Sequence, residues 1–368
     1  MAVIPNKYRR LKKSARTGVW SYGIVTMLFA VTFTMQSTGT MSYSFRGQLV
    51  PICTYIVMAL SLNLTVGFLG ELSLGHAGFM SVGAFSGVVA AVSLQDSMGS
   101  STMLLIAAIV IGGLFAGIAG LLIGIPVLRL RGDYLAIVTL AFGEIIKNVI
   151  NCLYVGADAN GLHFSLKSVS DLGMKNGKII VNGPQGALGI PKLATLTAGF
   201  ILILFTLFIV LNLINSKTGR AVTAIRDNRI AAESVGIGVT KYKLTTFIIS
   251  AALAGMAGAL YAMNFSTIAA KKFDFNTSIL ILVFVVLGGM GNIVGSIVAT
   301  AILYMLPELL RDFADYRMLL YAIVLIFVMI ATNSEKAIQL RDSFLTKLSS
   351  RKRKSKIGSE KKEAVNNE

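Results

Sequence analysis

The sequence predicts an all-α polytopic membrane protein with about eight full transmembrane helices, additional broken or re-entrant segments, and both termini in the cytoplasm. Of its 368 residues, 55% are apolar and 14% are charged, whereas soluble domains average about 45–50% apolar and 25% charged residues. The mean hydropathy is +0.74. Charge-free stretches of the length that a spanning helix needs, about 20 residues, recur along the chain.

Nine hydrophobic segments can be delimited from the positions of the charged residues. Eight are charge-free stretches, and one, 134–155, contains only Glu144 and Lys147. The first apolar run, 19–35, is long and lacks a cleavage site of small residues, so we expect a retained span rather than a signal peptide. The charge-free stretches are 17–45, 47–70, 72–95, 97–128, 193–216, 244–270, 275–307 and 318–334.

The distribution of Lys and Arg predicts the orientation, because cytoplasmic loops are enriched in both. Residues 1–16 carry six basic residues and no acid, the loop 217–243 carries six against two acids, and the tail from 333 carries ten against five. All three regions are expected in the cytoplasm. The formal charge of +17 is therefore interpreted as a topology signal beside anionic lipid, and no nucleic-acid partner is expected.

One segment must enter and leave on the same side of the membrane for this orientation to hold. Six segments precede the loop 217–243, and three follow it. The segment 278–310 is too long for one simple span and is interrupted by 288–292. The predicted organisation is a basic N-terminus (1–18), a membrane domain (19–332) with a cytoplasmic coupling loop (217–243) and an outer loop (156–192), and a disordered basic tail (333–368).

A second predicted break lies at 63–78. Six glycines between 67 and 87, with an acid and a histidine nearby, argue against a continuous helix, and a broken helix near the midplane presents N–H groups that suit a substrate carboxylate. Tight helix packing and a structural ion pair between Glu144 and Lys147 remain alternative interpretations. The candidate pathway residues are Asn63, Glu71, Ser73, His76, Gly78, Glu144, Gly289 and Asn292.

The loop 217–243 contains a predicted short helix. Asp227 or Asn228 is suited to cap it, Ala231 and Ala232 lie within it, and Gly236 ends it. Small alanines flanked by arginines suit insertion into a cleft of a partner, although a solvated basic loop would look similar. The candidate coupling residues are Arg226, Asp227, Asn228, Ala231, Ala232, Glu233 and Gly236.

Four stretches resemble the permease subunits of ATP-binding-cassette importers for branched-chain amino acids. Ala231-Ala232-x-x-x-Gly236 is similar to the coupling signature E-A-A-x-x-x-G, with Ile230 in place of the leading Glu. The fuller strings that resemble the family are R-D-N-R-I-A-A-E-S-V-G-I (226–237), L-S-L-G-H-A-G-F-M-S-V-G-A (72–84), L-R-L-R-G-D-Y-L-A-I-V-T-L-A-F-G-E-I (128–145) and G-G-M-G-N-I-V-G-S (288–296).

The resemblance implies a transport subunit of the bacterial cytoplasmic membrane that is not itself an enzyme. Its implied partners are a second permease subunit in a heterodimer, two cytoplasmic ATPase subunits and an extracytoplasmic amino-acid-binding protein. ATP is expected on the partners, because the nearest string to a phosphate-binding loop, 173–179, has the wrong spacing. No cofactor or metal site is expected in this chain. Its outer loop, 156–192, is longer than the resemblance leads one to expect.

Three other functions remain as alternatives. An ion-coupled secondary transporter would use Glu71, His76 and Glu144 as a proton relay. An importer permease for urea or short amides would share the architecture. An intramembrane enzyme is disfavoured, because the sequence shows no Ser/His/Asp set, paired carboxylates or metal-ligand cluster, and its two cysteines, Cys53 and Cys152, have no disulfide or zinc spacing.

Overall fold

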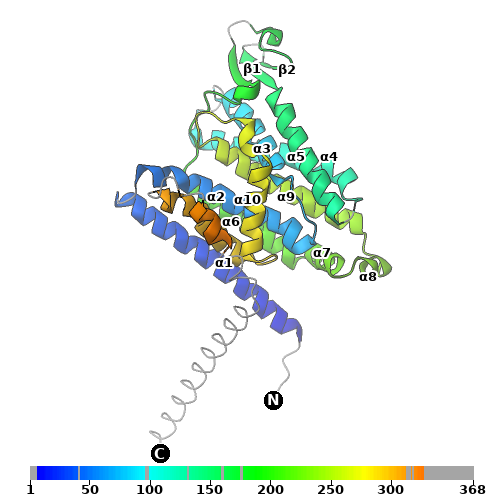
Figure 1. The fold of residues 1–368 in the computed structure, drawn as a ribbon. Coiled ribbons are helices and arrows are strands. Elements are labelled where there is room, and N and C mark those ends of the chain that lie inside the picture. Colours follow the sequence, from blue (N-terminus) through cyan, green and yellow to red (C-terminus); the bar gives the residue numbers. More distant parts are fainter. Residues whose placement is uncertain are drawn as a thin grey trace, which may run out of the picture. The chain divides into compact units, whose positions relative to one another are not determined.

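A computed structural model describes residues 6–39, 42–95, 99–130, 132–158, 161–174, 177–311, 316 and 319–326; for 6–17 and 133 only the backbone is described. The chain forms two compact units, 1–305 and 306–368. The first contains almost all of the described structure. Figure 1 shows its long helices, which all lie within one bundle with a small sheet.

Seven helices in the described residues are long and apolar enough to cross a membrane. This finding confirms the predicted all-α polytopic fold. They are α1 (Asn6–Ser37), α2 (Tyr43–Asn63, continued by a π-helical turn), α3 (His76–Leu94), α4 (Ser101–Val127), α5 (Asp133–Asn151), α6 (Leu196–Asn215) and α9 (Val239–Ala262). Two shorter apolar helices follow, α10 (Phe275–Gly288) and α11 (Ile293–Leu309).

Glycines let α3, α4 and α9 approach one another closely at the centre of the bundle. A Cβ on Gly83 of α3 would collide with the backbone of Gly255 of α9, and one on Gly112 of α4 would lie 2.7 Å from the carbonyl oxygen of Gly83. Close backbone approach through small residues is the usual way in which helices associate in lipid.

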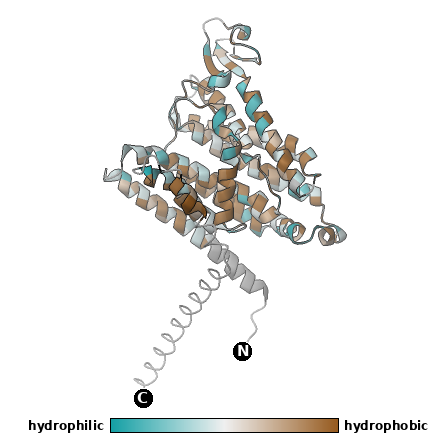
Figure 2. Cartoon of the chain, viewed as in Figure 1, coloured by the Kyte–Doolittle hydropathy of each residue, from teal (hydrophilic) through white to brown (hydrophobic). Residues whose placement is uncertain are grey.

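The outer faces of α1, α4 and α6 are apolar. Trp20, Leu122 and Phe208 have exposed fractions of 62%, 67% and 59%, and Figure 2 shows that hydrophobic residues predominate in much of the bundle. A soluble monomer rarely exposes so much contiguous apolar surface. Lipid hydrocarbon or other membrane-embedded helices must cover these faces.

The outer loop folds into a sheet, which the sequence reasoning did not predict. Strands β1 (Tyr154–Asp158), β2 (Gly161–Ser165) and β3 (Lys178–Asn182) pair antiparallel in the order β2-β1-β3. Short 3-10 turns lie at Ser170–Leu172 and Gly183–Gln185. The end of the loop is joined to the chain after α9, because Ala187 and Ile268 exchange backbone hydrogen bonds of 2.9 and 3.1 Å.

The chain reverses direction between α10 and α11. A 3-10 turn (Ala270–Phe273) precedes α10, which Asp274 caps by accepting a hydrogen bond from Thr277 N at 3.0 Å. The rings of Phe284 and Tyr304 both contact Tyr55 of α2, with centroids 6.3 and 4.6 Å away. A straight helix would separate residues 284 and 304 by about 30 Å. The predicted interruption at 288–292 is therefore a turn between two helices, which we call the re-entrant turn (289–292).

In the second unit, residues 319–326 are helical, and Arg311 lies 3.4 Å from Glu308. Most of the last expected span, 318–334, and the expected disordered tail, 333–368, fall outside the described residues. The predicted positions of the termini relative to the membrane stay predictions.

Candidate functional site

The cytoplasmic coupling loop predicted at 217–243 folds as two helices, α7 (Lys217–Asp227) and α8 (Arg229–Ser234). Asn228 is the residue that caps α8, because its Oδ1 accepts a hydrogen bond from Ala231 N at 3.0 Å. The helix stops before Gly236, whose φ of +80° is in the left-handed region that favours glycine. The capped short helix predicted from the sequence is confirmed.

One face of α8 packs against the neighbouring helices, and the opposite face is exposed. Ala232 is buried against Ile225 and Val239, so α8 is packed between the flanking helices. Ile230 and Val235 have exposed fractions of 78% and 75%. Arg229 and Glu233, 3.0 Å apart, form an ion pair along the helix. The outward face of α8 thus offers apolar side chains beside charged ones, a composition that suits a protein partner.

The predicted break at 63–78 is present. The π-helical turn η1 (Leu64–Leu69) ends α2, Gly70 follows with a φ of +77°, and α3 begins only at His76. A Cβ on Gly70 would lie 2.6 Å from Cγ of Arg226. The break therefore lies directly against the end of α7.

Arg226 joins the coupling loop to this break. Its Nη1 donates a hydrogen bond of 3.0 Å to the carbonyl of Gly67, while Nε and Nη2 bond Oδ1 of Asp227 at 3.2 and 3.0 Å. Sequence reasoning placed Arg226 in the coupling loop but missed Gly67 as its partner. No local pattern marks a carbonyl that lies 159 residues away in the sequence.

Asn63 joins the break to the re-entrant turn. Its Oδ1 accepts a hydrogen bond from Gly291 N at 2.8 Å, and its Nδ2 donates to Oγ of Ser296 at 3.0 Å. Asn292 in turn caps α11 by accepting from Gly295 N at 3.2 Å. The two breaks predicted from the sequence thus meet at a buried asparagine.

Glu71 forms an ion pair with Lys243, at the start of α9. The side chains are 16% and 5% exposed, respectively, so both charges are largely shielded from solvent. Sequence reasoning missed Lys243. Lys243 is one of two lysines near the start of α9, together with Lys241, so no sequence pattern marks it as the partner of Glu71.

Ser73 lies in the break and His76 is the first residue of α3, and both are buried. The His76 Nε2 lies 2.7 Å from Oγ of Ser61, and the backbone of Ala77 donates to Oγ of Ser278 at 3.1 Å. Among the described residues, Ser73 Oγ is the buried side-chain atom without a hydrogen-bond partner. The neighbouring cavity, which Gly78 and Glu144 line, has a volume of about 10 Å³, so there is room for a water molecule and no room for an amino acid.

Glu144 pairs with Lys147 on the same helix, one turn apart. With Glu71 held by Lys243 and His76 by Ser61, these three groups do not form the chain of hydrogen bonds that a proton relay requires. The described residues contain no cluster of three metal-ligating side chains.

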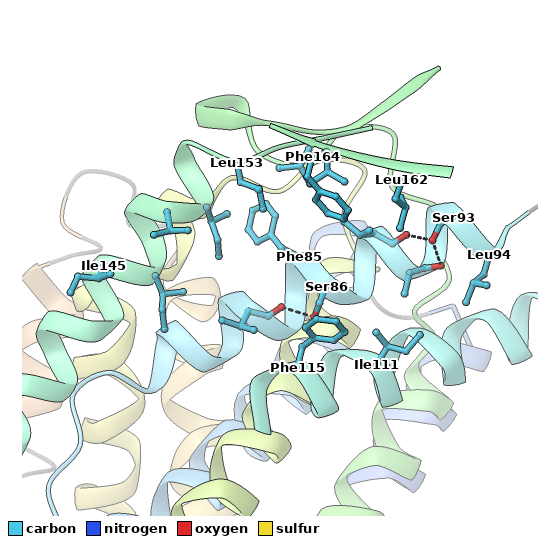
Figure 3. Close-up of a pocket in the computed structure, with 18 residues that line it drawn as sticks. Phe85, Ser86, Ser93, Leu94, Ile111, Phe115, Ile145, Leu153, Leu162 and Phe164 are labelled. Atoms are coloured by element: carbon cyan, nitrogen blue, oxygen red, sulfur yellow. Dashed lines mark hydrogen bonds between the residues drawn. The ribbon is translucent and has the colours of Figure 1, made fainter. Parts of the chain in front are cut away.

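An apolar groove of about 590 Å³ lies between α3, α4, α5 and the sheet. Figure 3 shows Phe85, Phe115 and Phe164 around it. Its hydroxyls are internally bonded: Ser86 donates to Val82 O at 2.6 Å and Ser93 to Val89 O at 2.7 Å. The groove therefore lacks free polar groups for the ammonium and carboxylate of an amino acid and suits hydrocarbon.

Apolar helices with two interior breaks, joined to a short loop helix that presents a partner surface, define a polytopic membrane transport permease. The chain belongs to the family of branched-chain amino acid transport system permease components, whose model matches residues 44–331.

Several named proteins are similar to the chain. It is 37% identical, over 287 residues, to the high-affinity branched-chain amino acid transport system permease protein LivM of Escherichia coli, covering 75% of this chain and 66% of that protein. It is 25% identical to the probable branched-chain amino acid transport permease protein LivM of Methanocaldococcus jannaschii, covering 71% and 79%. It is 28% identical to the L-arabinose ABC transporter permease protein AraH of Azospirillum brasilense, covering 68% of each. No solved structure matches the chain.

Proposed function

We propose that this chain is the permease subunit of an ATP-binding-cassette importer that moves branched-chain amino acids across the bacterial cytoplasmic membrane. The observation that carries the proposal is the geometry of α8, in which Ala232 packs against Ile225 and Val239 while Ile230, and Val235 just after the helix, are exposed. Membership of the family supports the same function. The relatives matched over 66% of their length support the substrate class.

The orientation follows from the basic residues. The loop that contains α7 and α8 carries six Lys and Arg against two acids, so it faces the cytoplasm. The sheet that follows α5 then faces outward, together with the segment that joins α9 to α10. With α10 and α11 entering and returning, both termini lie in the cytoplasm.

The transport cycle needs partners that supply ATP hydrolysis and substrate capture. Two ATPase subunits would contact α8 of this chain and the equivalent helix of a second permease subunit, forming a heterodimeric pore. An extracytoplasmic binding protein would deliver the amino acid to the face that carries the sheet. ATP would bind to the partner subunits and not to this chain.

Three of the candidate pathway residues are closed off in the structure. Asn63, Ser73 and His76 are each 1% exposed, and the cavity that Gly78 and Glu144 line has no room for an amino acid. We propose that the breaks at 63–78 and 289–292 border the pathway and separate when the partner ATPases close. Secondary transporters use such movement of packed segments around a fixed site, and we propose the same principle for this permease.

Substrate competition in cells tests the proposed class. Cells expressing the complete importer take up labelled leucine, and unlabelled isoleucine and valine compete with it. Urea and L-arabinose serve as competitors for the alternative classes. Leucine uptake that isoleucine and valine suppress supports the proposal. No leucine uptake, with transport of urea or L-arabinose instead, would reassign the substrate.

A further inference from the structure

The carbonyl of Gly67 is left without a partner from its own helix. At the break, the backbone N–H of Glu71 donates a hydrogen bond of 3.0 Å to the carbonyl of Thr65. The last turn of the helix therefore bonds the carbonyl of Thr65 and leaves that of Gly67 to another donor. Carbonyls in the last turn of a helix need an outside donor when they are buried. The guanidinium of Arg226 supplies that donor.

The backbone of the re-entrant turn and the side chain of Arg226 both contact the break at Gly67. A Cβ on Gly67 would occupy the position of Asn63 Oδ1 and of the backbone nitrogen of Gly291. Arg226 bonds the break on one side, and Asn63 bonds the re-entrant turn on the other. A displacement of Arg226 therefore reaches the re-entrant turn through two hydrogen bonds and one steric contact.

The segment that follows α8 also contacts the break at 63–78. Lys243, after α8, pairs with Glu71, four residues after Gly67. The coupling loop thus holds the segment 67–71 through one cation before α8 and another after it. A force that moves α8 must either carry this segment along or break the two contacts.

We propose that Arg226 is a positioning residue that transmits the movement of α8 to both helix breaks, by way of the Gly67 carbonyl and Asn63. The proposal rests on the proposed function, because the force on α8 is that of the partner ATPases. In this proposal Arg226 acts through its hydrogen bond to Gly67 inside the permease, and not through contact with the ATPase subunits. A physically connected element that both sites displace provides a direct route for coupling, and the Arg226–Gly67–Asn63–Gly291 contacts form one.

The test measures the number of leucine molecules imported per ATP hydrolysed by the complete importer in proteoliposomes. This ratio does not depend on how much of a variant folds, so a purely structural defect leaves it unchanged. Arg226→Gln removes the guanidinium. The matched control is Arg220→Gln, because Arg220 is an exposed arginine on the same helix whose guanidinium donates to the carbonyl of Asn215.

Asn63→Ala provides a second variant that lies inside the bundle, away from the outward face of α8. We expect Arg226→Gln and Asn63→Ala each to lower the ratio by about fivefold or more, the lower end of typical coupling effects, while Arg220→Gln stays within about twofold of the wild type. Both variants should still co-purify with the ATPase subunits.

Two results would overturn the proposal. One is a wild-type ratio in either Arg226→Gln or Asn63→Ala. The other is a lower ratio in Arg226→Gln alone, accompanied by loss of the ATPase subunits, which would assign Arg226 to the partner interface. If the wild-type importer itself takes up no leucine with ATP, the proposed function fails, and that outcome is recognisable before any variant is measured.

Discussion

Glu71 and Lys243 lie 172 residues apart in the sequence and form an ion pair inside the helix bundle. The first residue belongs to the break that follows α2, and the second lies one turn inside α9. Removing one partner of a shielded pair leaves an uncompensated charge, which costs about 3–5 kcal/mol.

Lys243→Met should therefore destabilise the chain strongly, by about 3 kcal/mol or more, as measured by thermal unfolding in detergent. Lys241→Met is the matched control, because Lys241 lies on the same helix and is exposed. Adding Glu71→Gln to Lys243→Met should recover most of the loss, since both charges are then absent. An equal effect of Lys241→Met and Lys243→Met would contradict the pairing.

The end of α8 depends on the left-handed backbone of Gly236. A Cβ at this position meets no other atom within 4 Å, so any effect of substitution comes from backbone strain and not from a clash. Gly236→Val should cost about 1–3 kcal/mol locally and should uncouple leucine uptake from ATP hydrolysis while membrane insertion stays intact. Asn tolerates the same φ, so Gly236→Asn should keep leucine uptake coupled to ATP hydrolysis far better than Gly236→Val does. Normal uptake by Gly236→Val would exclude a coupling role for this turn.

Packing of α3 against α9 should be intolerant of added volume. Gly83→Ala places a methyl group on the backbone of Gly255 and should cost about 1–3 kcal/mol. Gly23→Ala on α1, where a Cβ meets nothing within 4 Å, is the matched control and should be neutral. The thermal stability of the two purified variants provides the comparison, and a neutral Gly83→Ala would argue against the close approach of the two helices.

The re-entrant turn should be reachable from the cytoplasm. In a Cys152→Ser background, Met290→Cys should react with an impermeant maleimide only from the side that labels Ile230→Cys on α8. Leu166→Cys, beside the outer sheet, should react only from the opposite side. Met290 and Leu166 are 62% and 64% exposed, so a lack of labelling from one side cannot be due to burial of the side chain within the chain. Labelling of Met290→Cys from the outer side would contradict the assigned path of α10 and α11.

Much of the fold could be predicted from the sequence, because a helix that crosses lipid needs a long apolar stretch. Charge-free stretches of about 20 residues mark spans, and clustered glycines marked both breaks. The capped helix α8 followed from Asn228 and Gly236, whose effects are local. The outer sheet was missed although Asn160-Gly161 is a hairpin turn signal, because its strands are short and two of them contain a glycine.

The contacts across the site could not be predicted, since each joins residues that are distant in the sequence. Asn63, Glu71 and His76 were singled out as pathway residues because they are polar and lie at the glycine-rich break. The structure adds that Asn63 bonds Gly291, Glu71 pairs with Lys243, and His76 bonds Ser61. Each partner is ordinary in its own stretch of sequence, and only the packing of the helices brings them together. Their role in the pathway remains a prediction.

Transport in proteoliposomes that contain the complete importer tests the central claim most directly. With ATP on the side of α8 and the amino-acid-binding protein on the other side, labelled leucine should accumulate inside against its gradient. Uptake should stop when a non-hydrolysable ATP analogue replaces ATP, and it should not change when ion gradients are dissipated. Leucine accumulation that proceeds without ATP and collapses with the ion gradient would contradict the assignment of this chain as an ATP-driven permease subunit.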